Sequence, residues 1–149
     1  MPNEKISTST LLRRLFKTAS IARFIRHFDR QMEFVTFDIY ITDLCVNKNI
    51  RPEHIIIKSG IERTYGHQLF NGRRKPSRDK VMQLAFGFEM NYNEAQDLLK
   101  AARKSPLHPK IKRDAVIIYA LNRGIAMSDV QATLHELELP ILGKEDRYG

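Results

Sequence analysis

Apolar residues recur at steps of three and four along most of this chain, which is the spacing of one face of an α-helix. In residues 37–103 these runs are separated by turn residues at Gly60 and at Asn71-Gly72. The pattern predicts five helices in this part of the chain, near 37–47, 52–59, 62–70, 77–86 and 92–103. The chain is therefore predicted to be all-α.

Residues suited to helix ends support these boundaries. Pro52 fits the first turn of the second helix, because its ring fixes φ near the helical value. Ser77 fits an N-cap, and Asn91 with Glu94 has the spacing of a capping box, with Asn replacing the usual Ser or Thr. Candidate core residues are Phe37, Tyr40, Ile41, Leu44, Cys45, Val81, Met82, Leu84, Ala85, Ala95, Leu98, Leu99 and Ala102.

The C-terminal part shows a weak internal repeat with a period of 35 residues. Leu84-Ala-Phe recurs as Tyr119-Ala-Leu, and Asn93-Glu-Ala-Gln recurs as Ser128-Asp-Val-Gln. A connector with two prolines, residues 104–109, precedes the second copy, and helices are predicted near 110–123 and 127–137. Two copies are fewer than a solenoid needs. We interpret the repeat as a second helical hairpin stacked on the first, with chance similarity as the alternative. The tail at 144–149 is predicted to be frayed.

The apolar spacing in the N-terminal part of the chain predicts one basic amphipathic helix over residues 8–33. Apolar residues from Leu11 to Phe28 form its stripe, and arginines and a lysine occupy much of the remainder. Four interpretations of this helix are open. It packs on the domain with its charged face in solvent, it contacts the DNA backbone, it forms a dimer interface, or it lies on a membrane surface. The composition also resembles an organelle-targeting peptide, which the rest of the chain argues against.

Composition narrows the class of function. The chain has 149 residues and a formal net charge of +8 at pH 7, which favours a polyanionic partner. A lone Cys45 in an apolar stretch indicates a buried, unreactive thiol in a reducing compartment. The five histidines have no metal-ligand spacing, and no phosphate loop or nucleophile–base motif is present. No apolar run has the ~18 residues of a membrane span. We therefore expect a soluble protein that is not an enzyme and binds no cofactor or metal.

The segment from Gly60 to Pro76 carries the strongest functional signal. It predicts a polar helix that Asn71-Gly72 ends, followed by three cations and a proline. The segment resembles the lambda-repressor-like helix-turn-helix regulators (the Cro/repressor, XRE-type family), which carry a turn Gly, a recognition helix and an Asn-Gly before a basic loop. The resemblance covers roughly residues 37–101. It implies a five-helix DNA-binding domain at 37–103, flanked by an N-terminal basic helix at 1–36 and a C-terminal hairpin and tail at 104–149.

The resemblance also assigns candidate contacts with DNA. Base reading falls on Arg63, Thr64 and Gln68, which share the outward face at the start of the recognition helix. Arg suits the O6 and N7 of guanine, and Gln suits adenine. Candidate phosphate ligands are Tyr65, His67, Asn71, Arg73, Arg74, Lys75 and Arg78.

Two features depart from the family pattern. Gly66 lies where the recognition helix usually turns an aliphatic side chain into the core, and a hole is predicted there, to be filled by Tyr65 or an aromatic residue of the N-terminal helix. Ile55-Ile56-Ile57 is more apolar than one buried face requires, so one of these side chains is expected to face the added helices or a partner.

We therefore expect a sequence-specific DNA-binding transcriptional regulator, most simply a repressor, that is bacterial or phage-encoded, cytoplasmic and associated with the nucleoid. Double-stranded DNA is the expected partner. A homodimer is also expected, because affinity grows with the number of phosphates neutralised, and its surface would be the fifth helix or the C-terminal hairpin. The alternatives are a protein-interaction adaptor or antitoxin-like subunit that binds a protein through the N-terminal helix or C-terminal hairpin, and a non-specific nucleic-acid binder.

Overall fold

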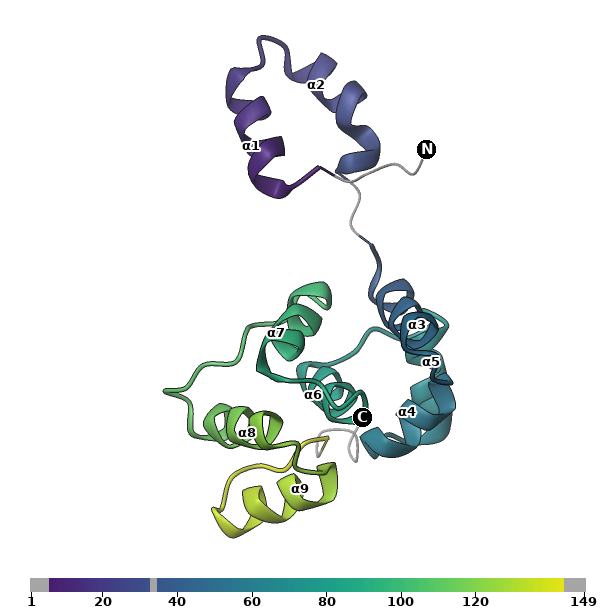
Figure 1. The fold of residues 1–149 in the computed structure, drawn as a ribbon, viewed down its shortest axis with the longest axis vertical. Coiled ribbons are helices and arrows are strands. Elements are labelled where there is room, and N and C mark those ends of the chain that lie inside the picture. The colour runs from purple at the N-terminus through teal and green to yellow at the C-terminus, as the bar shows by residue number, and fades with distance from the viewer. Residues whose placement is uncertain (1–5, 33–34, 144–149) are drawn as a thin grey trace. The chain divides into compact units, whose positions relative to one another are not determined.

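The computed structural model describes residues 6–32 and 35–143, which fold as helices and loops without a β-strand (Figure 1). The predicted all-α class is confirmed. The chain divides into two compact units, Met1–Phe34 and Val35–Gly149. None of the helices formed by the described residues has the length and apolarity needed to cross a bilayer. The tail predicted to be frayed, 144–149, lies outside the described residues.

In the first unit, the described residues 6–32 form two α-helices where the sequence predicted one. Helix α1 spans Thr8–Lys17, α2 spans Ile21–Phe28, and the 3-10 turn η1 spans Asp29–Gln31. The prediction of a single helix was wrong because the segment between α1 and α2 contains a residue that ends the first helix and a residue that caps the second. Thr18 has extended backbone geometry, with ψ of 140°, and the Ser20 side chain accepts a hydrogen bond from the Arg23 amide as an N-cap.

This small unit packs around two phenylalanines. Phe24 and Phe28 are buried, with ring centroids 4.7 Å apart, and the Arg14 guanidinium lies 5.8 Å from the Phe28 ring. Much of the predicted apolar stripe is exposed instead of forming one buried face. The exposed apolar residues of this unit are Leu12, Leu15, Phe16, Ile21, Ile25 and Met32.

Residues 35–143, the described part of the second unit, form seven helices. Their bounds are α3 Phe37–Lys48, α4 Pro52–Ser59, α5 Arg63–Phe70, α6 Arg78–Gly87, α7 Tyr92–Ala101, α8 Lys112–Arg123 and α9 Met127–Glu136. All lie within two residues of the predicted ranges. Figure 1 shows α6 in the middle of this unit, with α3, α4 and α5 to one side and α8 and α9 to the other. The predicted caps of α6 and α7 are also confirmed, including the capping box of Asn91 and Glu94.

Close approach of α4 to α6 organises the core. A Cβ added to Gly87 of α6 would overlap the Ser59 hydroxyl and lie 2.7 Å from the carbonyl oxygen of Ile55. Ser59 is fully buried, and its hydroxyl donates to that same carbonyl at 2.7 Å. Ile55 and Ile56 are buried, whereas Ile57 is 73% exposed. The Ile triplet therefore supplies two core residues and one surface residue, as its excess apolarity indicated.

Cys45 lies in the core beside Ile41 on α3. Burial raises the pKa of its thiol, because a thiolate loses hydration in an apolar environment. A neutral, enclosed thiol matches the unreactive cysteine that the sequence indicated.

The 35-residue repeat is present in the fold, with the same register throughout. Shifting the bounds of α7, Tyr92–Ala101, by 35 gives those of α9, Met127–Glu136. The left-handed residues that follow the helices also correspond: Glu89 with Gly124, and Arg103 with Glu138. Helices α8 and α9 form a second helical hairpin that contacts the first, as the repeat was interpreted.

The same glutamine clasp closes each copy. Gln96 donates to the carbonyl of Leu107 at 3.1 Å and accepts from its amide at 2.8 Å. Gln131 makes the same two bonds with Leu142, at 2.7 and 2.8 Å. Each clasp holds an extended segment against the second helix of its own hairpin, which buries both leucines. We name residues 78–108 the first repeat and residues 113–143 the second repeat.

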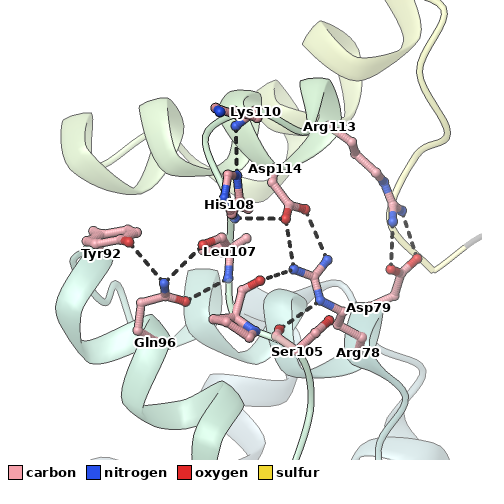
Figure 2. Close-up of polar contacts among 11 residues, drawn as sticks. Arg78, Asp79, Tyr92, Gln96, Ser105, Leu107, His108, Lys110, Arg113 and Asp114 are labelled. Carbon is pink, nitrogen blue, oxygen red and sulfur yellow. Dashed lines mark hydrogen bonds and ion pairs between the residues drawn. The ribbon is translucent and has the colours of Figure 1, made fainter.

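Two reciprocal ion pairs join the repeats (Figure 2). Arg78 of the first repeat forms a two-pronged contact with Asp114 of the second, at 3.0 and 2.9 Å. Arg113 of the second repeat forms the same contact with Asp79 of the first, at 2.9 and 2.8 Å. Asp114 is only 1% exposed. Such forked, enclosed pairs fix geometry as well as charge.

Substitution of Gly87 by Ala is expected to destabilise the second unit by about 2 kcal/mol, because the added methyl meets backbone as well as the Ser59 hydroxyl. Chemical unfolding followed by circular dichroism measures this loss. Gly124→Ala is the matched control: it has open space but a φ of +65°, so only the strain of about 1 kcal/mol is expected. Equal losses in the two variants would contradict the steric explanation.

Candidate nucleic-acid interface

Helices α4 and α5 pack against each other and are joined by a short turn. Helix α4 ends at Gly60, whose φ of +69° places it in the left-handed region that glycine tolerates best. Ile61 then turns into the core, and Glu62 caps α5 by accepting from the amides of Thr64 and Tyr65 at 2.9 and 2.8 Å. The turn is fixed at both ends, so the direction of α5 follows from α4. We call α5 the candidate recognition helix.

The inner face of α5 contacts α4 through Gly66. A Cβ on Gly66 would lie 2.5 Å from Cγ2 and 2.8 Å from Cγ1 of Ile56. The predicted hole is therefore a wrong expectation, because Ile56 of α4 already occupies the space. Neither Tyr65 nor an N-terminal aromatic residue is needed to fill it. The glycine allows the two helices to approach closely, and Leu69, fully buried, continues the same face.

The outer face of α5 begins with Arg63 and Thr64, both exposed. The Arg63 side chain is 75% exposed, and its Nε lies 2.8 Å from Oε1 of Glu53 on α4. An ion pair at this exposure is weak because water screens it. Arg63 is therefore accessible, but a ligand that binds its guanidinium would have to displace the carboxylate of Glu53.

Gln68 belongs to a cluster with Arg74 and Tyr65. The Arg74 Nε donates to Oε1 of Gln68 at 3.0 Å, and the Arg74 guanidinium lies 4.4 Å from the centroid of the Tyr65 ring. The bond fixes the Gln68 amide, because arginine only donates and so must face the oxygen. The Gln68 nitrogen is therefore oriented away from Arg74. The sequence assigned these three residues separately, and the structure brings them together.

The loop after α5 presents Arg73, Arg74 and Lys75 at the surface. Asn71 shapes this loop: its side-chain oxygen accepts from the Arg73 amide at 2.9 Å, as in an Asx turn. Gly72, with φ of +82°, lies against Asp38 of α3, where a Cβ would be 2.9 Å from the carboxylate. Asn71 therefore has a local structural role, and the cations beside it remain exposed.

Two predicted phosphate ligands lie elsewhere. Arg78 bonds Asp114 and also donates to the carbonyls of Ser105 and Pro106, each at 3.0 Å, so its charge is neutralised inside the fold. His67 is half-buried, and its Nε2 is enclosed without a hydrogen-bond partner among the described residues. Arg78 is engaged by its ion pair and carbonyl partners, and the Nε2 atom of His67 is enclosed although the residue is only partly buried. We leave these two residues out of the candidate interface.

Sequence reasoning missed two carboxylates at the tip of α5, Glu53 and Glu62. Backbone hydrogen bonds from Tyr65 and then Thr64 lower the pKa of Glu62, with a smaller contribution from nearby Arg74. The position of Glu62 directly before the helix was a usable signal for an N-cap. The pairing of Glu53 with Arg63 depends on the angle between two helices, and no spacing in the sequence predicts it.

The site is therefore a convex surface with a helix tip that carries hydrogen-bond donors and a flanking basic loop. No cluster of three His, Cys, Asp or Glu side chains that could hold a metal occurs among residues 6–32 and 35–143. The chain matches no protein-family model, no curated protein and no solved structure.

Acidification is expected to remove the stabilisation that Glu62 gives to α5. Its folded-state pKa is lowered, so its contribution is present above the ordinary glutamate pKa of about 4.3 and is lost as pH falls through the folded value. Thermal unfolding of the native protein and of Glu62→Gln, measured from pH 7 to pH 3, tests this. The native protein should be the more stable at pH 7, with the gap closing toward pH 3. A gap that is constant over this range would exclude the charge as its cause.

Proposed function

We propose that this protein is a sequence-specific DNA-binding regulator of transcription that inserts α5 into the major groove. The observation that carries the proposal is the arrangement of α5. It is held by α4 on its inner face, and it presents the exposed Arg63 and Thr64 and the partly buried Gln68 beside three exposed cations. A major groove admits one α-helix, and its base edges offer the acceptors that Arg and Gln bind.

The surface has two parts, a basic loop suited to phosphates and a helix tip suited to bases. This division supports sequence-specific recognition in addition to binding of the DNA backbone. Cations on the loop after α5 suit phosphates, which fix the register of a protein on the duplex without reading bases. Base reading requires side chains held in place, and the bond from Arg74 to Gln68 provides this at one position. The two carboxylates at the helix tip act against indiscriminate binding, because they repel phosphates wherever Arg63 gains no base contact. The lambda-repressor-like assignment and a repressor role belong to this proposal.

Substitution of Arg63 or Gln68 by Ala is expected to lower discrimination between the preferred duplex and its single-base variants by about ten-fold each, corresponding to roughly 1–3 kcal/mol per base contact. Lys75→Ala should instead weaken binding to all duplexes alike and reduce the salt slope by about 1. Fluorescence anisotropy on a duplex chosen from a random pool, over a range of salt concentrations, measures both quantities.

Lys112→Ala is the matched control, since it removes one exposed cation from α8 outside the helix-turn-helix. It should change affinity far less than Lys75→Ala. Equal losses on every duplex for all four variants would leave only non-specific binding. Binding to no duplex at any salt concentration would end the proposal and favour an adaptor that binds protein.

Glu53→Gln is expected to have the opposite sign and to tighten DNA binding about two- to five-fold. The substitution releases Arg63 from an exposed ion pair worth about 0.2–1 kcal/mol and removes a negative charge near the duplex. The same titrations measure it. Glu138→Gln, in the second repeat, removes the same charge away from α5 and should leave affinity nearly unchanged. Weaker binding by Glu53→Gln would mean that its carboxylate orients Arg63 productively.

A further inference from the structure

The two repeats contact each other by a self-complementary pattern. Each residue of the first repeat corresponds to the residue 35 positions later in the second. When corresponding residues are exchanged, the ion pair Arg78–Asp114 becomes the ion pair Arg113–Asp79. The flanking bonds obey the same exchange. Arg78 donates to the carbonyls of Ser105 and Pro106, and Arg113 to those of Pro140 and Ile141, which are 35 residues further on.

The amide bonds to the carboxylates complete the pattern. Asp114 accepts from the amide of His108 at 3.0 Å, and Asp79 accepts from the amide of Gly143 at 3.0 Å. The helices behave likewise, since α7 contacts α8 and α6 contacts α9. A stack of repeats would carry each contact forward to the next copy. Contacts that return to the first copy instead have the reciprocity of an isologous interface, the kind that joins two subunits of a symmetric dimer.

This interface is filled within one chain. Asp114 is 1% exposed, Asp79 is 9% exposed, and the apolar side chains of both repeats close around them. A second copy of the chain could form the same contacts only by opening two forked ion pairs. The fifth predicted helix, α7, and the C-terminal hairpin, which the sequence offered as alternative dimer surfaces, contact each other within the chain, because α7 packs on α8.

Only the hairpin is duplicated. Helices α3, α4 and α5 precede the first repeat, and the second repeat follows a short connector without a second helix-turn-helix. A true two-fold dimer would bring two recognition helices to DNA. The duplicated hairpins of this chain bring one.

We propose that the second repeat takes the place of a second subunit, so that the protein binds DNA as a monomer with one α5 on a site without inverted symmetry. This inference rests on the proposed function. Its ligand is a single asymmetric site within about one turn of duplex, instead of the two half-sites that a homodimer would need. One α5 also neutralises few phosphates, so the salt dependence of binding should be shallow.

Two measurements on the full chain test this inference. Sedimentation velocity across a wide range of protein concentrations should give the mass of one chain. Selection from a random duplex pool should give one motif without an inverted repeat, with one chain bound per duplex. A dimer in solution, two chains per duplex, or an inverted-repeat motif would each overturn the inference.

A pair of matched variants separates the cis interface from the proposed function. Asp79→Asn and Asp114→Asn break equivalent ion pairs, so both should lower stability while the sedimenting mass stays that of one chain. Full stability in both variants would contradict the role given to these ion pairs in closing the interface. If no duplex is enriched in the selection, the DNA-binding proposal fails. Sedimentation of the native chain then decides the interface alone: a monomer supports it and a dimer overturns it.

Discussion

The position of α5 depends on how closely α4 approaches its two neighbours. Gly66 lets α5 lie directly on Ile56, and Gly87 lets α6 lie on Ser59 and on the carbonyl of Ile55. A side chain at either glycine would push α4 away, and the exposed face of α5 would turn with it. Glycine in a helix interior costs about 1 kcal/mol relative to Ala. Here that cost is offset by packing that a larger residue would prevent.

The ion pairs between the repeats hold the second repeat against α6, just as the glycine contacts hold α4 against it. Arg78 and Arg113 each neutralise a carboxylate and also bind carbonyl groups of an extended segment that has no regular hydrogen bonds of its own. Enclosed polar groups are tolerated only when they are fully bonded. These side chains therefore hold two irregular segments in place. This explains why Arg78, although next to a basic loop in the sequence, does not act as part of that loop.

Helix bounds were predictable because stops and caps lie in the local sequence, as Gly60, Ser77 and Asn91 show. The repeat was also visible, although only as weak similarity. Side-chain partners were not predictable, because they depend on helix crossings: Arg78 reaches Asp114, 36 positions away, and Arg63 reaches Glu53 on the preceding helix. The break of the N-terminal helix at Thr18 was missed because an apolar stripe continues across it. The outward position of Arg63 and Thr64 was expected from the family resemblance and agrees with helical spacing, and both residues are exposed.

The reciprocal ion pairs also restrict how the two repeats can diverge. Many equivalent positions now differ, such as Glu89 and Gly124 or Tyr92 and Met127, whereas the Arg-Asp dipeptide is identical in both copies. Loss of either aspartate strands an arginine in the other copy, so neither copy can drift at this dipeptide independently. The dipeptide therefore couples the two repeats, since a change at one copy alters the environment of a charged side chain in the other.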